Sequence, residues 1–116
     1  MKEGASEIYV SITGLKLRSP LQAPLFSWHA MRSFSQASSA PGNLSTDARK
    51  VDGIHHTLTV WTSREAMLTY LRSAAHLKAM KAFKSIGTGK VHGYHSKNTP
   101  SWAEALAIWR ENSRAV

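Results

Sequence analysis

The chain has 116 residues, the usual size of one domain, and we expect residues 1–116 to share a single core. Hydrophobic residues make up 42% and charged residues 19%, which excludes a disordered chain, while fifteen Lys and Arg against seven Asp and Glu give a net charge of +8. Cysteine is absent, which excludes disulfides and thiolate chemistry and favours a cytoplasmic protein. We expect no membrane span, because no apolar run approaches ~20 residues, and no signal peptide, because the N-terminus Met1-Lys2-Glu3-Gly4 does not resemble one.

The first elements are predicted by their periodicity. Residues 7–14 alternate Ile8, Val10 and Ile12 with more polar neighbours, which predicts a half-buried strand. A helix is expected from Pro24, because proline is tolerated in the first turn, and apolar residues recur at helical spacing as far as Ala37. The run at residues 38–43 is rich in Ser, Pro and Gly and predicts a loop.

A hairpin is expected next. Residues 44–50 are polar and weakly patterned, as in an edge strand, and Asp52-Gly53 suits a tight turn. Residues 54–61 form the strongest predicted strand, and neither of its faces is fully polar. We therefore expect a central strand covered on both faces.

The second half predicts three helical stretches and one strand. Thr62 stands three residues before Glu65, a capping-box pattern that predicts a helix start. A second helical stretch is expected over residues 74–83, after a break at residues 73–75, and a fourth strand over residues 90–95. Ser101 and Glu104 form another capping box and predict a terminal helix.

This element order predicts an α+β fold. A βαββαβ chain with an extra C-terminal helix fits the ferredoxin-like arrangement, an antiparallel sheet with helices on one face. The other sheet face is then expected to be bare. A second copy of the chain would cover it most simply, which predicts a homodimer, the dimeric α+β barrel.

One stretch carries a family resemblance. Residues 58–67, continuing through residues 70–73 to His76 and Met80, resemble the antibiotic-biosynthesis-monooxygenase-type dimeric α+β barrel superfamily. The shared features are a strand ending in an aromatic residue, a capped helix that begins Trp-x-Ser, and a second helical segment after a serine. A weaker resemblance, to spheroidene-monooxygenase-like proteins, lies in residues 9–13 and the Trp-containing terminal helix. The superfamily includes cofactor-free oxygenases of polyketide-like quinols and haem-degrading oxygenases.

The haem-degrading branch is not matched at its own positions. By position, the tryptophan that contacts haem in that branch falls on Tyr70, and the haem-ligating histidine falls on Met80. The first-strand asparagine of that branch has no counterpart in residues 8–14. We therefore expect no cofactor, and haem degradation is disfavoured.

Histidines supply most of the candidate chemistry. The spacing contains no recognisable metal motif, because His55 and His56 point to opposite faces of a strand, as do His92 and His95. We expect no metal site. His76 forms an i, i+4, i+7 stripe with Met80 and Phe83, which predicts an inward imidazole able to act as a general base.

The expected substrate pocket has His76 as its catalytic residue. Its expected substrate-binding residues are aromatic, imidazole or thioether side chains: Trp28, His29, Trp61, Tyr70, Met80 and Tyr94. The alternative interpretation is that these side chains only pack the core, with His76 bonded to a backbone carbonyl.

Charge gives a third possibility. No acidic residue lies between Ala66 and Ala103, and Lys78, Lys81 and Lys84 share one helix face. This face could contact nucleic acid or an anionic membrane, or steer an anionic substrate, but a solvated surface is the simpler interpretation and makes nucleic acid an unlikely partner.

The leading hypothesis is a cofactor-independent monooxygenase-like protein for a small hydrophobic or aromatic substrate. The alternative is a non-catalytic ligand-binding homodimer of the same fold.

Overall fold

The computed structural model describes residues 7–115, apart from the side chains of Ala74 and Ala75. The elements follow the predicted order, with a short β5 and a 3-10 turn added: β1 (Ile8–Leu17), η2 (Pro20–Gln22), α1 (Ala23–Ser39), β2 (Asn43–Val51), β3 (Ile54–Trp61), α2 (Arg64–Leu71), α3 (Ala74–Ile86), β4 (Gly87–Ser96), α4 (Trp102–Asn112) and β5 (Arg114–Ala115). The strands form one antiparallel sheet in the order β2-β3-β1-β4-β5. This confirms the α+β, ferredoxin-like prediction.

The predicted hairpin is present at one edge of the sheet. β2 is the edge strand, and the turn to β3 passes through Asp52 and Gly53 with φ angles of 51° and 79°. Positive φ at both positions is what a tight hairpin turn requires. β3 lies inside the sheet as expected. The middle strand of the sheet is β1.

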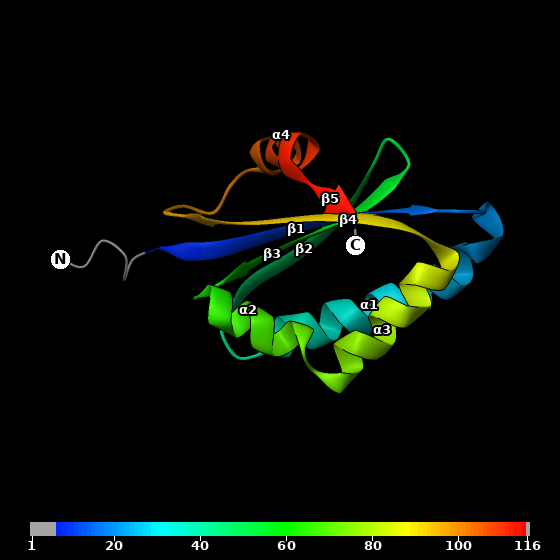
Figure 1. Ribbon diagram of the computed structural model, residues 1–116, viewed down its shortest axis with the longest axis horizontal. Coiled ribbons are helices and arrows are strands. Elements are labelled where there is room, and N and C mark those ends of the chain that lie inside the picture. Colours follow the sequence, from blue (N-terminus) through cyan, green and yellow to red (C-terminus); the bar gives the residue numbers. More distant parts are fainter. Residues whose placement is uncertain (1–6, 116) are drawn as a thin grey trace.

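Helices cover both faces of the sheet. Figure 1 shows α1, α2 and α3 on one face and α4 on the other. The α4 side holds the larger buried cluster: Val10, Ile12, Leu58, Ala105, Leu106 and Trp109. The expectation of a bare second face was wrong, because the apolar stripe of the C-terminal helix packs on that face within the same chain.

Trp109 fixes α4 on the sheet through Gly14. A Cβ added at Gly14 would overlap Cζ2 of the Trp109 indole, so the ring rests directly on the β1 backbone. The indole Nε1 donates a hydrogen bond of 3.0 Å to the Lys90 carbonyl. His56 meets the same ring edge-on, with centroids 4.6 Å apart, and its Nδ1 lies 3.0 Å from the Thr13 carbonyl. His56 is therefore a packed core residue.

Helix starts match the sequence patterns with one exception. The capping box of α4 is present at Ser101 and Glu104. At α2 the N-cap is Ser63, which accepts a hydrogen bond from the Ala66 N–H, and the expected Thr62 cap was wrong. The break before α3 lies where predicted, with Ser73 as its N-cap.

Several boundaries differ from the prediction, and β1 continues to Leu17 rather than ending at Gly14. α3 continues three residues further, to Ile86, and β4 begins at Gly87 rather than at Lys90. The extra residues pair with the far end of β1, where Leu17 lies opposite Gly87. Within residues 7–115, no helix is long and apolar enough to span a bilayer.

Candidate functional site

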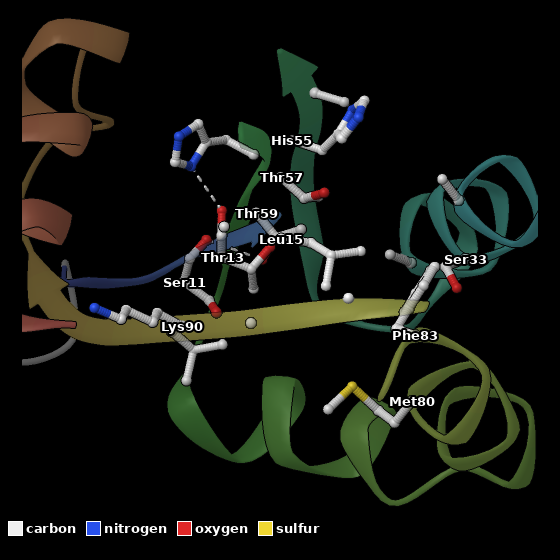
Figure 2. Close-up of a pocket in the computed structure, with 18 of the residues that line it drawn as sticks. Ser11, Thr13, Leu15, Ser33, His55, Thr57, Thr59, Met80, Phe83 and Lys90 are labelled. Atoms are coloured by element: carbon white, nitrogen blue, oxygen red, sulfur yellow. Dashed lines mark hydrogen bonds between the residues drawn. The ribbon is translucent and has the colours of Figure 1, made fainter. Parts of the chain in front are cut away.

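A cavity of about 710 Å³ lies between the sheet and the layer formed by α1, α2 and α3. Hydroxyl side chains form its floor on the sheet (Figure 2). Strand register places Ser11 opposite Thr59 and Thr13 opposite Thr57, and all four line the cavity. The volume is that of a site for a drug-sized molecule.

Apolar side chains form the wall opposite this floor. Phe26 on α1 and Phe83 on α3 lie with ring centroids 5.8 Å apart, and Met80 extends the wall along α3. Ser33 of α1 also faces this space (Figure 2). A flat apolar molecule could therefore lie between a hydroxyl-bearing surface and an apolar one.

One end of the cavity is closed by an aromatic cluster made of Trp61, Tyr70 and His76. The Trp61 and Tyr70 rings are stacked with centroids 5.5 Å apart, and the His76 ring meets Tyr70 edge-on at 4.9 Å. The Tyr70 hydroxyl donates a hydrogen bond of 3.2 Å to the Ser33 carbonyl, which ties α2 to α1. Burial raises the pKa of Tyr70, so its hydroxyl stays protonated at neutral pH.

Unpaired polar atoms gather around the same cavity. Four buried side-chain polar atoms in the described part of the chain have no hydrogen-bond partner, and three of them belong to cavity-lining residues: Ser33 Oγ, Trp61 Nε1 and His76 Nδ1. Buried polar groups normally have partners, and unpaired ones are costly. Each of these three atoms has almost no accessible surface, so they are packed within the cavity wall rather than open to its interior.

The α2–α3 break positions His76. Ser73 caps α3 by accepting a hydrogen bond of 3.2 Å from the His76 N–H, which fixes His76 in the first helical turn. Burial lowers the pKa of the His76 imidazole, and the Leu71 carbonyl opposes this in part. The positive end of the helix dipole also disfavours an imidazolium. The ring is therefore neutral near pH 7 and able to accept a proton.

A second histidine lies at the other end of the cavity floor. His55 is the second residue of β3 (Figure 2). Its ring contacts Phe26, with ring centroids 4.2 Å apart. Burial lowers the pKa of His55, and the neighbouring Lys50 and His56 add to this effect. His55 is therefore also neutral near pH 7.

The structure brings together four of the residues singled out from the sequence. Trp61, Tyr70, His76 and Met80 all line the cavity. The other three lie outside its lining: Trp28 is 59% exposed on α1, His29 contacts Phe83 only at its edge, and Tyr94 lies on the α4 face opposite Val10.

Sequence analysis missed the hydroxyl floor. The Ser and Thr residues of β1 alternate with Val10 and Ile12, and this alternation looks like a solvent-facing side. In the structure that side faces the helices across the cavity, while Val10 and Ile12 pack on α4. The available signal was that β1 and β3 both carry hydroxyls on one face.

No metal centre is evident in residues 7–115. No group of three or more His, Asp or Glu side chains is placed there to hold an ion. The cavity offers instead a neutral base, hydroxyl groups and aromatic surfaces.

Comparisons with known proteins show the fold. SnoaB from Streptomyces nogalater, described as a cofactor-independent oxygenase, superposes with a TM-score of 0.69 over 82% of this chain and 97% of its own, at 16% identity. A Nitrosomonas europaea protein assigned to the antibiotic biosynthesis monooxygenases gives a TM-score of 0.68 over 78% of this chain and 89% of its own, at 14% identity.

A Caulobacter crescentus protein with the same assignment superposes with a TM-score of 0.67 over 80% of this chain and 91% of its own, at 15% identity. No family model matches the sequence, and no curated protein aligns with it significantly. The suspected antibiotic-biosynthesis-monooxygenase fold is thus confirmed by structure, at identities too low to carry an activity across.

Proposed function

We propose that this chain, which has the antibiotic-biosynthesis-monooxygenase fold, oxygenates a small aromatic substrate without a cofactor. The observation that carries the proposal is the neutral imidazole of His76, a residue of the cavity with aromatic and hydroxyl-bearing walls. Similarity of fold to SnoaB, a cofactor-independent oxygenase, supports it as an analogy.

Such a reaction must draw its electrons from the substrate. His76 would remove a proton from an activated C–H or phenolic O–H group and leave an electron-rich carbanion or phenolate. The anion passes electrons to O2 and forms a carbon–oxygen bond as a peroxide. Loss of water then breaks the O–O bond, so that a ring CH2 plus O2 becomes C=O plus H2O. One oxygen atom enters the product, and no external reductant is needed.

The remaining cavity residues have positioning roles in this proposal. Trp61 and Tyr70 stack on each other and offer aromatic surface at one end of the substrate. Thr57 and Thr59 offer hydroxyls along the floor. The apolar wall of Phe26 and Phe83 excludes water, which protects the anion from being quenched by protons.

The test uses anthrone, a tricyclic compound with an acidic CH2 group. Purified protein treated with a chelator is expected to consume O2 with anthrone and to form anthraquinone at one O2 per product. Binding of anthrone without O2 consumption beyond the uncatalysed rate contradicts the proposal and favours the alternative, a non-catalytic ligand-binding protein.

We also expect the protein to be a homodimer, as the sequence suggested. The sheet face first assigned to the contact is covered by α4, so a contact has to be sought elsewhere. Exposed apolar side chains occur in η2 and the first half of α1, where Leu21, Trp28 and Met31 are 88%, 59% and 73% exposed. Light scattering checks this expectation, and a monomer at micromolar concentration contradicts it.

A further inference from the structure

The side of α1 that faces away from the sheet carries exposed apolar side chains. Phe26 marks the inner side, because its ring lies 4.2 Å from the His55 ring on the sheet. Trp28 follows two residues later, about 200° around the helix, and is therefore directed away from the sheet. Leu25 and Met31, three residues to either side of Trp28, share this outer side and are exposed as well.

Together with the exposed Leu21 of η2, these residues form a row that we name the apolar stripe: Leu21, Leu25, Trp28 and Met31. Intervals of four, three and three residues keep them on one side of a helix. The outer side of a surface helix is normally polar. Single exposed apolar residues need no explanation, but a group of them marks a contact surface.

The neighbouring helix α3 places lysines beside the apolar stripe. The Phe83 ring of α3 lies 5.8 Å from the Phe26 ring of α1, so the two helices pack side by side below the sheet (Figure 1). Phe83 lines the cavity, and Lys81, two residues earlier and about 200° around α3, faces away from it. Exposed lysines three residues to either side complete what we name the lysine row: Lys78, Lys81 and Lys84.

This outer face has cations without acidic neighbours in the sequence. Residues 8–46 contain no Asp or Glu, and neither do residues 66–103, so η2, α1 and α3 carry no acidic residue. Glu65 in the first turn of α2 is the acidic residue of the helical layer. Arg32 adds a further cation beside the apolar stripe, 5.7 Å from the centre of the Trp28 ring.

Charge decides which occupant fits this face. A second copy docked on it would bring the lysine row of one protomer close to that of the other, and like charges repel. A nucleic acid would match the lysines but would leave the apolar stripe without a partner. An anionic lipid surface matches both, because it offers negative headgroups above an apolar layer.

We propose that the outer face of α1 and α3, made of the apolar stripe and the lysine row, docks on an anionic lipid bilayer. The apolar stripe enters the boundary between headgroups and acyl chains, to a depth of about 5–10 Å. Trp28 lies at the level of the headgroups, where tryptophan is enriched, and the lysines contact the anionic lipids. This binding is separate from the proposed oxygenation, because the apolar stripe, Lys78 and Lys81 lie outside the cavity lining.

Vesicle flotation tests the proposal with two lipid compositions, pure phosphatidylcholine and a mixture with about 30 mol% phosphatidylserine. At about 100 mM salt the protein is expected to bind the anionic vesicles at least about tenfold more strongly, and about 500 mM salt is expected to reduce this preference. Equal binding to the two compositions, or no binding at about millimolar lipid, would overturn the proposal.

Two lysine pairs separate local charge from net charge. Lys78→Gln/Lys81→Gln is expected to lose most of the preference for phosphatidylserine. Lys50→Gln/Lys97→Gln removes the same net charge from exposed residues outside the helices and is expected to keep the preference. Equal losses in the two pairs would show that only net charge matters and would overturn the proposal.

A third variant tests the apolar stripe. Leu25→Ser/Met31→Ser is expected to weaken binding to the phosphatidylserine vesicles at least about tenfold, because the apolar area buried in lipid is lost. Leu44→Ser, at an exposed leucine of β2, is the matched control and is expected to bind as the wild type does. If Leu25→Ser/Met31→Ser instead turns a wild-type dimer into a monomer in light scattering without lipid, the stripe is a contact between copies and the proposal is overturned.

Trp28 reports which surface meets the lipid. Lipids brominated on their acyl chains quench indole fluorescence at short range, so the wild-type fluorescence is expected to fall on brominated anionic vesicles. Trp28→Phe keeps an aromatic ring and is expected to bind but to lose most of this quenching, because Trp61 and Trp109 are buried and Trp102 begins α4 on the opposite sheet face (Figure 1). Quenching that persists in Trp28→Phe would place another surface on the bilayer and overturn the proposal.

A DNA duplex of about 20 base pairs supplies negative charge without an apolar layer. Binding to this duplex at about 100 mM salt, lost in Lys78→Gln/Lys81→Gln and stronger than binding to the anionic vesicles, would assign the face to nucleic acid and overturn the proposal. Anthrone oxidation has no bearing on these outcomes, because soluble anthrone requires no lipid. Vesicle binding that depends on the apolar stripe and the lysine row supports the proposal whether or not anthrone is oxidised.

Discussion

The imidazole of His76 meets the ring of Tyr70 edge-on, with ring centroids 4.9 Å apart. This contact holds the first turn of α3 against α2 and places a neutral imidazole in the cavity lining. Tyr70 is itself fixed by its hydrogen bond to the Ser33 carbonyl, so the position of the base depends on the packing of all three helices.

Replacing His76 tests its role as the base. His76→Gln keeps a polar side chain that cannot accept the proton, and anthrone oxidation is expected to fall by about 10²–10⁴. Because His76 is only partly buried, the thermal midpoint is expected to move by a few degrees at most. His92→Gln, on the opposite sheet face, is the matched control and is expected to keep full activity. Equal losses in both variants would contradict the assignment.

The pH dependence follows from the direction of the His76 shift. Burial lowers the pKa of His76, so the neutral base is fully present at pH 7 and is lost only as the pH falls through a value below about 6.5. The acid limb of kcat/KM for anthrone is therefore expected below about pH 6.5. An acid limb with its midpoint above about pH 6.5 would contradict this prediction, because it would mean that the folded protein stabilises the imidazolium form of His76.

Stability is expected to fall in acid for a related reason at His56. Burial, chiefly, lowers the pKa of His56, and the nearby Arg110 adds to this while the Thr13 carbonyl opposes it. The unfolded chain therefore binds more protons than the folded one below about pH 6.5, and stability rises with pH across this window. His55 and His76 act with the same sign.

Urea unfolding at about pH 7.5 and about pH 5.5 checks this linkage. The wild type is expected to have the lower midpoint at acid pH, and His56→Leu is expected to narrow the difference. His92→Leu serves as the comparison, because His92 stacks on Tyr94 rather than on the Trp109 ring of α4. An unchanged difference in His56→Leu would show that His56 does not contribute to the acid sensitivity.

Close packing at Gly14 gives a prediction about stability alone. A methyl group there would press on the Trp109 ring, and Gly14→Ala is expected to lower the free energy of unfolding by about 1–3 kcal/mol. Gly53 has a positive φ and nothing within 4 Å of an added Cβ, so Gly53→Asn, which tolerates this backbone conformation, is expected to be nearly neutral. Chemical denaturation compares the two variants, and equal stabilities would contradict the packing of α4 on β1.

The order of elements could be predicted because each carries a local signal. Asp52-Gly53 predicts its turn, and Ser101 with Glu104 predicts the start of α4. The position of α4 could not be predicted, because its apolar stripe is equally suited to either sheet face and the choice depends on contacts between residues far apart, such as Trp109 with Gly14.

The candidate site could be predicted only in part for the same reason. His76, Met80 and Phe83 share a helix face, so their common direction follows from spacing alone. Trp28 was expected among them but lies on the outer side of α1, because the inner side is taken by Phe26 and Ser33. The position of Lys50 beside His55 depends on strand register, which no local pattern encodes.

The central claim is that the chain inserts one atom of O2 into an aromatic substrate without a cofactor. Mass spectrometry of the product formed from anthrone under 18O2, with chelator-treated protein, tests it most directly. With the wild-type protein we predict anthraquinone carrying one 18O atom, formed at a rate proportional to the protein concentration. With His76→Gln we predict a rate no faster than that of the uncatalysed reaction. Product formation that never exceeds the protein-free control would contradict the account.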